Sequence, residues 1–219
     1  MKIKQYNYLL FDLDGTLADP SEGITKCIAY ALEHFGIETP DLHILESWIG
    51  PPIKQSLMEI HHFDEAQADL GLEKYRERFT ETGIYENRLF DDVPELLSQL
   101  KQKGYHISLA TSKPTVFAER ILEHFGIRQY FDFVGGAGLD DSRPTKGHVI
   151  QHVIEQTALN NPSEALMIGD RKYDIIGGKS FQIDTAGLLH GFGSREELTE
   201  AGATYIFDDL EMLADFLIV

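Results

Sequence analysis

Apolar residues follow two different spacings along the chain, and the change between them divides it. Residues 8–11 form an unbroken apolar run of the kind found in buried strands. Between residues 20 and 82 the apolar positions recur at helical spacing, without strand-like alternation, and they predict a helical block. From about residue 89 onward, short apolar runs alternate with helical patterns. Such alternation predicts a parallel sheet covered by helices on both faces.

The boundaries of the predicted elements follow from glycine, proline and capping residues. In the alternating part we expect strands at residues 105–110, 131–134, 165–168, 185–189 and 205–207, and helices at 92–104, 114–125, 146–157, 173–181, 194–201 and from 210 onward. In the helical block we expect helices at residues 24–35, 41–48, 53–60 and 64–82. The sequence Glu-His-Phe-Gly-Ile ends a predicted helix twice, at residues 33–37 and 123–127, and it is typical of a glycine C-cap. The glycine-rich residues 135–138 lack the spacing of a nucleotide-binding loop and are interpreted as a flexible turn.

The composition fits this organisation. The 219 residues are 42% hydrophobic and 25% charged, the balance of a soluble globular protein with one well-buried core and a smaller satellite domain. We therefore expect residues 1–17 and 89–219 to form an α/β core domain, and residues 18–88 to form a helical domain inserted into it.

Net charge and cysteine content narrow the possible partners and compartment. A formal net charge of −17 argues against a nucleic acid or an anionic membrane as partner, because the field of the protein would repel phosphate groups. The single cysteine, Cys27, cannot form an internal disulfide, and its apolar neighbours indicate a buried helical thiol. No stretch approaches about 18 apolar residues, the length that spans a membrane. We expect a cytoplasmic protein.

The first predicted strand ends in two carboxylates, Asp12 and Asp14, which are separated by one leucine. Side chains two residues apart point to the same side of an extended chain, and close like charges are costly unless a cation or a shared proton relieves them. A divalent metal ion is the simplest relief. The alternative is that both are ordinary strand-end and turn residues, since Asp-Gly is a common turn pair.

Polar side chains also follow later predicted strands. Thr111 and Ser112 end the second strand, and Asp170 ends the fourth. Asp174 lies one helical turn beyond Asp170, and Lys146 opens the helix before that strand. The carboxyl ends of parallel strands share one edge of the sheet, where ligands bind. Carboxylates for a hard cation, hydroxyl groups for a phosphate and one balancing ammonium group together indicate phosphoryl transfer.

Four segments carry these residues: FDLDGTL at residues 11–17, ATSKP at 110–114, SRPTKG at 142–147 and MIGDRKYD at 167–174. In this order they resemble the four motifs of the haloacid dehalogenase-like hydrolase superfamily. The resemblance implies a Rossmann-like α/β core with a parallel sheet and helices on both faces, and an inserted all-helical cap domain of the C1 type. Within the superfamily the chain is most similar to phosphoglycolate phosphatase-like and 5'-nucleotidase-like members, for which the cap sequence WIGPP and the run GDRKYDIIG are typical.

The resemblance implies roles for the two aspartates of the first motif. Asp12 would attack phosphorus as the nucleophile and form an aspartyl-phosphate. Asp14 would protonate the leaving oxygen and afterwards activate the water. True dehalogenases resemble this scaffold but lack the second aspartate, since a halide leaving group needs no proton. The presence of Asp14 therefore favours phosphatase chemistry.

The resemblance also implies a Mg²⁺ site. Its expected ligands are Asp12, the backbone carbonyl of Asp14, and Asp170. Asp174 is expected either as a further ligand or as support for the others. Mg²⁺ is the only cofactor that we expect.

Phosphate binding is assigned to the second and third motifs. Thr111 and the backbone of Ser112 are expected to hold the phosphoryl oxygens, and Lys146 is expected to bridge phosphate and nucleophile. In the superfamily this lysine often stands directly before a proline, whereas here Pro144 precedes Lys146. Lys146 is preferred because it starts the helix before the fourth strand, and Lys113 is the second choice.

Substrate choice is expected to depend on the cap. Its candidate contact residues, carried over from the WIGPP resemblance, are Trp48, Ile49, Gly50, Pro51 and Lys54. The alternative for Trp48 is packing within the cap alone. Residues 15–19 and 83–89 link cap and core and are expected to flex when the cap closes.

These expectations combine into one preferred function with alternatives. We expect a Mg²⁺-dependent phosphatase, phosphoglycolate phosphatase-like, that hydrolyses a small phosphomonoester through an aspartyl-phosphate. The alternatives are a 5'-nucleotidase or pyrophosphatase on the same scaffold, a phosphomutase of the same superfamily, and a non-enzymatic module that binds metal or accepts phosphate. The expected partner is a small phosphorylated metabolite, and the protein is expected to be a monomer or a homodimer.

Overall fold

The computed structural model describes residues 5–39, 41–140 and 142–218, and the chain divides into two compact units. The first unit is discontinuous and comprises Met1–Ala18 and Leu89–Val219. The second unit, Asp19–Arg88, is inserted between the two parts of the first. Across the described ranges, none of the helices is long and apolar enough to cross a membrane.

A six-stranded sheet forms the centre of the first unit. Its strands are β1 (Tyr8–Phe11), β4 (His106–Pro114), β5 (Phe133–Ala137), β6 (Ala165–Gly169), β7 (Asp184–Leu188) and β8 (Tyr205–Phe207). Their order in space is β5-β4-β1-β6-β7-β8, and every neighbouring pair is parallel. Parallel neighbours need crossover connections, which helices provide here.

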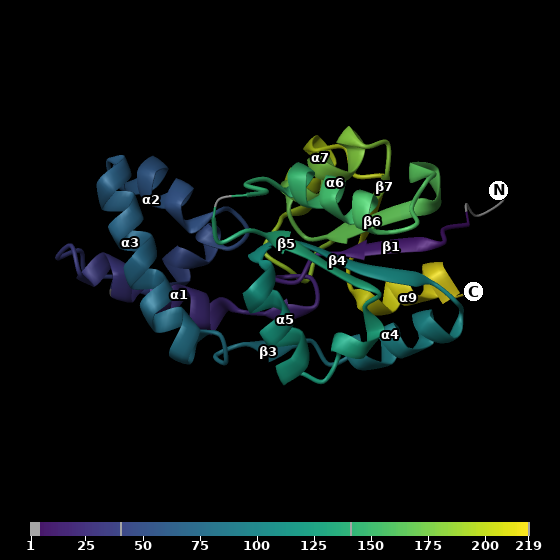
Figure 1. The fold of residues 1–219 in the computed structure, drawn as a ribbon, viewed down its shortest axis with the longest axis horizontal. Helices are drawn as coiled ribbons and strands as arrows, with labels where there is room; N and C mark the ends of the chain where they lie inside the picture. Colours follow the sequence, from purple (N-terminus) through teal and green to yellow (C-terminus); the bar gives the residue numbers. More distant parts are fainter. Residues whose placement is uncertain (1–4, 40, 141, 219) are drawn as a thin grey trace. The chain divides into compact units, whose positions relative to one another are not determined.

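Helices cover both faces of this sheet (Figure 1). They are α4 (Val93–Gln102), α5 (Thr115–His124), α6 (Lys146–Gln156), α7 (Lys172–Ser180), α8 (Arg195–Glu200) and α9 (Leu210–Ile218), with short 3-10 turns η3 (Arg128–Tyr130) and η4 (Pro162–Glu164). Helices α6 and α7 lie on one face, and α4, α5 and α9 lie on the other (Figure 1). Leu9, Leu10 and Phe11 of β1 are at most 1% exposed, because both faces of the strand are covered. The predicted Rossmann-like parallel-sheet core is confirmed.

Strand β1 lies inside the sheet, between the strands β4 and β5 on one side and the strands β6, β7 and β8 on the other, so the order in which the chain adds strands reverses at β1. Its last residue, Phe11, is in register with Leu109 of β4 on one side and with Ile168 of β6 on the other. The chain therefore leaves β1, β4 and β6 at the same edge of the sheet. Open parallel sheets bind their ligands at such a switch point.

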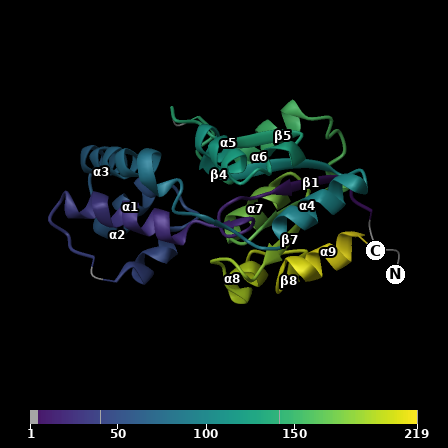
Figure 2. The same ribbon diagram turned by 90° about the horizontal axis from the view of Figure 1, so that it is seen from below.

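The second unit is built from helices, as the apolar spacing between residues 20 and 82 predicts. They are α1 (Ser21–Glu33), the 3-10 helix η1 (Leu42–Trp48), α2 (Ile53–His61), α3 (Glu65–Arg78) and the π-helix η2 (Phe79–Gly83). Helix α3 packs against α1 and α2 (Figure 2). The chain enters and leaves this unit through two short strands that pair with each other, β2 (Ala18–Asp19) and β3 (Arg88–Leu89). Two residues are too few to show an alternating pattern, and neither strand is predicted from the sequence.

The repeated Glu-His-Phe-Gly-Ile sequence ends one helix in each unit in the same way. Gly36 and Gly126 have φ angles of 73° and 65°, in the left-handed region. The N–H of the isoleucine that follows each glycine donates to the carbonyl of a leucine in the last helical turn. Glycine adopts this conformation without steric cost. The predicted C-cap is confirmed at both helix ends.

The interpretation of residues 135–138 as a flexible turn is wrong, because Gly135 and Gly136 lie inside β5. A Cβ on Gly135 would stand 2.5 Å from the side chain of Val153, and one on Gly136 would stand 2.5 Å from the carbonyl oxygen of Lys113. The two glycines therefore allow β5 to approach α6 and the end of β4 closely. Glycine is depleted in strands, and this is why the sequence pattern places the strand too early, at residues 131–134.

Candidate active site

Three buried aspartates converge at the carboxyl edge of the sheet. Asp12 directly follows β1, Asp170 directly follows β6, and Asp174 lies in the first turn of α7. One carboxylate oxygen from each lies within 4.8 Å of the other two. Hard divalent cations prefer oxygen ligands of this kind. The structure thus brings together three of the predicted metal ligands in a group that can hold a metal ion.

Burial and mutual repulsion make this group of carboxylates unfavourable on its own. Burial raises the pKa of Asp170 well above its usual value, and the neighbouring charges of Asp174 and Asp12 raise it further. Burial also raises the pKa of Asp174; Lys146 opposes this shift, and Asp12 adds to it. A divalent cation among these oxygens would relieve the repulsion, so the donor set fits a metal.

Lys146 supplies the ammonium group beside Asp12 and Asp174. It is the first residue of α6, whose N-cap Thr145 accepts a hydrogen bond from the backbone N–H of His148. The Lys146 ammonium forms ion pairs with Asp12 Oδ2 and Asp174 Oδ1, both at 2.8 Å, and donates to the carbonyl of Ala110 at 2.9 Å. Burial lowers the pKa of Lys146, but the charges of Asp12 and Asp174 outweigh burial and the net shift is upward. The ammonium group therefore stays charged.

Asp14 has a different cation for its neighbour. Its Oδ2 forms an ion pair with Lys113 Nζ at 2.9 Å, and both side chains are nearly buried. Its Oδ1 is buried and, within the described part of the chain, has no hydrogen-bond partner. Burial raises the pKa of Asp14, and Lys113 opposes that shift. The two lysines considered for the third motif thus have separate partners, Lys146 beside Asp12 and Lys113 beside Asp14.

Strand β4 carries the predicted phosphate-binding residues to the same edge. The strand continues to Pro114, so Thr111 and Ser112 belong to it, whereas the sequence pattern ends the strand at residue 110. Thr111 is buried, and its hydroxyl oxygen accepts from the N–H of Lys113 at 3.2 Å. Because β4 and β6 flank β1, these residues lie on the side of Asp12 opposite to Asp170.

Sequence analysis missed the donors that hold Asp170. The hydroxyl of Thr16 donates to Asp170 Oδ1 at 3.2 Å, and the backbone N–H of Phe192 donates to Oδ2 at 2.8 Å. Thr16 belongs to the first motif, but Phe192 lies in the loop after β7, to which no role is assigned from the sequence. A backbone donor can be supplied by almost any residue type. The available signal was the Gly-Phe-Gly sequence at 191–193, after a strand that ends at this edge.

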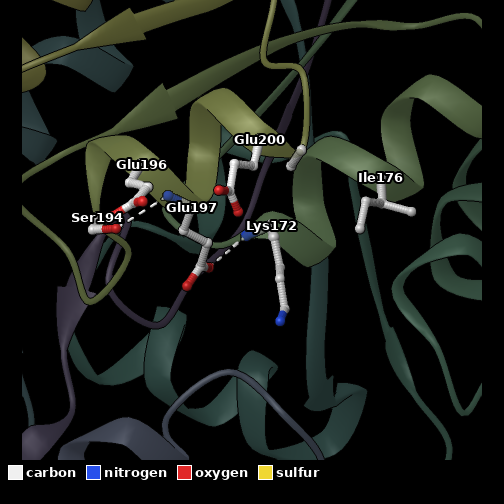
Figure 3. A pocket seen from close by; sticks show the side chains of 7 residues that line it. Lys172, Ile176, Ser194, Glu196, Glu197 and Glu200 are labelled. Atoms are coloured by element: carbon white, nitrogen blue, oxygen red, sulfur yellow. Dashed lines mark hydrogen bonds between the residues drawn. The ribbon is translucent and has the colours of Figure 1, made fainter.

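A separate pocket of about 470 Å³ lies between α7 and α8. Its lining residues are Lys172, Ile176, Ser194, Glu196, Glu197, Glu200 and Ala201 (Figure 3). Glu197 points to the start of α7, where one carboxylate oxygen accepts from the backbone N–H of Lys172 at 2.8 Å and from Arg171 Nε at 2.9 Å. This contact anchors the first turn of α7, which also carries Asp174. None of the pocket residues is a predicted site residue.

The cap candidates are buried or half-buried. Trp48 and Ile49 are 3% and 1% exposed, and the Trp48 ring lies 5.5 Å from that of His61. Gly50 has a φ of 112°, a conformation that glycine adopts readily, and Pro51 is half-buried. The Lys54 ammonium group forms an ion pair with Asp69 at 2.5 Å. The contacts described for Trp48 and Lys54 are therefore contacts inside the helical unit.

Comparison with known proteins identifies relatives over nearly the whole chain. Residues 9–188 match the sequence model of the haloacid dehalogenase-like hydrolase family. A 5'-nucleotidase from Pseudomonas aeruginosa is 44% identical over 97% of this chain and 96% of its own length. The crystal structure of a predicted phosphatase from Clostridium acetobutylicum superposes with a TM-score of 0.93, at 47% identity, over 96% of this chain and 97% of that chain.

Two further relatives carry other names. A phosphoglycolate phosphatase from Colwellia psychrerythraea is 30% identical over 97% of both chains. The tyrosine-protein kinase PtkA from Mycobacterium tuberculosis is 34% identical over 90% of this chain and 67% of its own length. The resemblance seen in the four motifs is confirmed by these matches. This chain belongs to the haloacid dehalogenase-like hydrolase family.

Proposed function

We propose that this chain is a Mg²⁺-dependent phosphatase that hydrolyses a small phosphomonoester through an aspartyl-phosphate formed on Asp12. Its family and its phosphatase and 5'-nucleotidase relatives support the reaction class. The observation that carries the proposal is the pairing of one buried ammonium, Lys146, with both Asp12 and Asp174. This pairing supports the assignment of Asp12 as nucleophile, Lys146 as the cation for phosphoryl oxygens and Asp174 as a metal-binding carboxylate.

Binding of the metal ion and of the substrate's phosphoryl group is assigned to residues of the first unit. Asp12, Asp170 and Asp174 would hold Mg²⁺ together with the backbone carbonyl of Asp14. When bound, Mg²⁺ supplies positive charge that allows an anionic nucleophile to approach an anionic substrate. The hydroxyl of Thr111 and the backbone of Ser112 are assigned to the phosphoryl oxygens, beside Lys146. Substrate selection is assigned to the helical unit.

In the first chemical step, Asp12 accepts the phosphoryl group. One of its carboxylate oxygens attacks phosphorus, and the bond between phosphorus and the leaving oxygen breaks. The carboxylate is oriented for attack, because Oδ1 accepts from the backbone N–H of Leu13 at 2.7 Å and Oδ2 contacts Lys146. Asp14 in its protonated form donates a proton to the leaving oxygen.

In the second step, water releases the phosphate. Asp14, now ionised, accepts a proton from water, the water oxygen attacks phosphorus, and the bond from phosphorus to Asp12 breaks. Inorganic phosphate leaves and both aspartates return to their starting states. The upward pKa shift of Asp14 supports this role, because it brings the group closer to a value at which a proton can be both given and taken.

Nucleoside 5'-monophosphates are proposed as the preferred substrate class. The 5'-nucleotidase relative shares 44% identity with this chain, whereas the phosphoglycolate phosphatase relative shares 30%. This reverses the order expected from the motifs alone, which placed phosphoglycolate first. Both relatives match over nearly their full length, so the helical unit is included in each comparison.

Phosphate release from a panel of substrates tests the proposal. The panel contains nucleoside 5'-monophosphates, phosphoglycolate, pyrophosphate and sugar phosphates, each with Mg²⁺ and with EDTA. We expect Mg²⁺-dependent release, fastest from a nucleoside monophosphate, and a phosphorylated Asp12 peptide after acid quenching. An additional arm with ATP and no other substrate detects lasting self-phosphorylation, the result expected of a kinase.

Two outcomes would contradict the proposal. Asp12→Asn with near wild-type turnover would exclude the aspartyl-phosphate, and turnover unchanged by EDTA would exclude the metal. Transfer of the phosphoryl group between positions of a sugar phosphate, without phosphate release, would identify a phosphomutase instead. Asp14→Asn should abolish turnover while Mg²⁺ affinity stays within about threefold of wild type, since only its backbone carbonyl is assigned to the metal.

A further inference from the structure

The loop between β7 and α8 lies against Asp170 and against the first motif. Both oxygens of Asp170 have a donor, Thr16 Oγ1 on Oδ1 and the Phe192 N–H on Oδ2. Thr16 and Asp170 are themselves fully buried. A carboxylate oxygen has two acceptor positions, so each one can still bind a metal while it accepts one hydrogen bond. The two donors therefore fix the orientation of Asp170 and leave it able to act as a ligand.

Three glycines make this enclosure possible. Gly15 has a φ of 77°, and a Cβ there would collide with the Asp170 carboxylate and the Phe192 ring. A Cβ on Gly191 would collide with the carbonyl oxygen of Gly15, and one on Gly193 with that of Asp170. The backbone of residues 191–193 therefore lies directly against the first motif and against Asp170. We call Gly15, Thr16, Asp170 and residues 190–193 the Asp170 clamp.

His190 joins the two sides of the clamp. Its Nε2 donates to the backbone carbonyl of Thr16 at 3.1 Å, and its ring stands edge-on to Phe90, with ring centres 4.6 Å apart. Its Nδ1 is buried and has no hydrogen-bond partner among the residues that the structure describes. The neutral form with the proton on Nε2 is the one that fits, since the Thr16 carbonyl can only accept and Nδ1 has no acceptor for a second proton among the described residues.

His190 is linked to Asp170 indirectly, in two ways. The first passes through Thr16, whose carbonyl accepts from His190 and whose hydroxyl donates to Asp170. The second passes along the chain, because Phe192 lies two residues beyond His190 and donates to the other oxygen. The same side chain thus restrains both donors of one carboxylate. Groups that orient a metal ligand commonly affect metal affinity by about 10- to 100-fold.

We propose that His190 is a positioning residue for the metal site, which holds Thr16 and the 190–193 loop so that Asp170 meets Asp12 and Asp174. The inference rests on the proposed metal-dependent function for its effect on metal binding, but the clamp itself is a property of the metal-free protein. His190 touches none of the reacting groups, so its removal should act on metal affinity and leave the chemical step largely intact at saturating metal.

The test compares His190→Phe with His190→Gln. Phe keeps a flat ring against Phe90 but has no donor, whereas Gln can place an amide N–H near the position of Nε2. His152→Phe is the matched control, because His152 also stands edge-on to a phenylalanine, Phe133, at 5.5 Å. Calorimetric titration with Mg²⁺ should show about 10-fold weaker binding for H190F, and binding within about threefold of wild type for H190Q and H152F. At saturating Mg²⁺, kcat of H190F should lie within about threefold of wild type.

Hydrogen exchange in EDTA tests the clamp without any metal. The Phe192 amide should exchange about 10-fold faster in H190F than in wild type, and at the wild-type rate in H152F. Combining H190F with Thr16→Val should weaken Mg²⁺ binding by less than the product of the two separate effects, because both act on Asp170 through Thr16. His190→Ala replaces H190F in every arm if the bulkier variant does not fold.

The outcomes separate this proposal from the proposed function. Wild-type Mg²⁺ affinity and wild-type Phe192 exchange in H190F would overturn the role of His190, whatever the reaction. Equal loss of affinity in H190F and H190Q would also overturn it, because the donor would then not matter. If wild-type protein binds no Mg²⁺, the proposed function fails, while the exchange rates still decide whether His190 holds the clamp.

Discussion

Each unit of the molecule contains a cluster of charged side chains, and the two clusters differ in their balance of charge. The core cluster has four carboxyl groups, Asp12, Asp14, Asp170 and Asp174, and two ammonium groups, Lys113 and Lys146. The cap cluster has two carboxyl groups, Glu22 and Glu86, and two cationic groups, Lys26 and Arg78. One cluster carries excess negative charge in a buried place, and the other is balanced.

The pKa shifts of the acids follow this difference. In the core cluster, burial raises the pKa of Asp14 and Asp170 above their usual values. In the cap cluster, Arg78 and Lys26 lower the pKa of Glu86, with Arg78 donating to both of its carboxylate oxygens at 2.7 and 3.0 Å. In a balanced ion-pair cluster the charges compensate one another, and no further ion is needed. Buried carboxylates in excess are unfavourable alone, and this is the usual mark of a site that binds something else.

The largest expected effect is on turnover, when one carboxylate in each cluster is replaced by the corresponding amide. Asp12→Asn should lower kcat by about a thousandfold or more, because an amide cannot serve as the nucleophile. Glu86→Gln should leave kcat within about threefold of wild type, because Glu86 only completes an ion-pair cluster in the helical unit. Turnover of both variants on the best substrate of the panel measures the contrast. Equal losses would mean that the two clusters do not differ in the way described.

Metal affinity gives the next largest effect. Asp174→Asn should weaken Mg²⁺ binding by about 10-fold or more, whether Asp174 binds the metal directly or holds Lys146 and the start of α7. Glu86→Gln should bind Mg²⁺ as wild type does. Calorimetric titration of both variants measures the difference. Unchanged affinity in Asp174→Asn would remove Asp174 from the metal site.

The pH dependence of stability should separate the clusters without any ligand. A carboxyl group whose pKa is raised by folding binds more protons in the folded than in the unfolded state, between its usual pKa of about 4 and its raised value. In EDTA, the free energy of unfolding of wild type should therefore fall relative to that of Asp174→Asn as pH rises from about 5 to about 8. Urea unfolding at several pH values measures this slope. Burial lowers the pKa of His190, so this residue makes an opposite contribution to the pH dependence of stability. The contribution is the same in wild type and in Asp174→Asn, and it cancels when the two proteins are compared. A wild-type free energy of unfolding that rises relative to that of Asp174→Asn over the same pH range would contradict the upward shift of the Asp174 pKa.

The smallest expected effect is the loss of stability when the cap cluster loses one charge. Glu86→Gln should lower the free energy of unfolding by about 1 kcal/mol, because the cluster is partly exposed to solvent and the screening of its charges limits the loss. Arg78 would keep a contact with the thiol of Cys27 at 3.3 Å. Urea unfolding at pH 7 measures the loss. A loss several times larger would indicate that Glu86 is needed for the helical unit to fold.

The outline of the core cluster was predictable because its members stand at the ends of elements with clear patterns. The apolar runs of β1 and β6 mark where Asp12 and Asp170 leave the sheet, and the parallel arrangement puts both at one edge. Lys146 was placed by the capped start of α6 in the same way. Each of these inferences uses spacing along the chain and one rule of sheet topology.

The pairing inside the cluster was not predictable from spacing. Lys113 and Lys146 both lie near a motif, and the structure alone shows which lysine contacts Asp12 and which contacts Asp14. The clamp was missed because its key donor on Asp170 is the backbone N–H of Phe192, which leaves no trace in residue type. Strand β5 was misplaced because close packing requires glycine at positions where strand propensity disfavours it.

The place of β1 in the sheet has a consequence for the growing polypeptide on the ribosome. β1 is the first strand of the sheet to be made, but its two neighbours are β4 and β6, so its second edge stays unpaired until Gly169 has been added. At about 5 to 20 residues per second, this delay is roughly 10 to 30 s. The helical unit, complete at Arg88, can fold during that time, before the unit that it interrupts. Nascent chains arrested on the ribosome at roughly 130 residues should therefore resist protease within the helical unit, while β1 stays sensitive. Equal protection of both segments would show that β1 becomes structured before β6 is made.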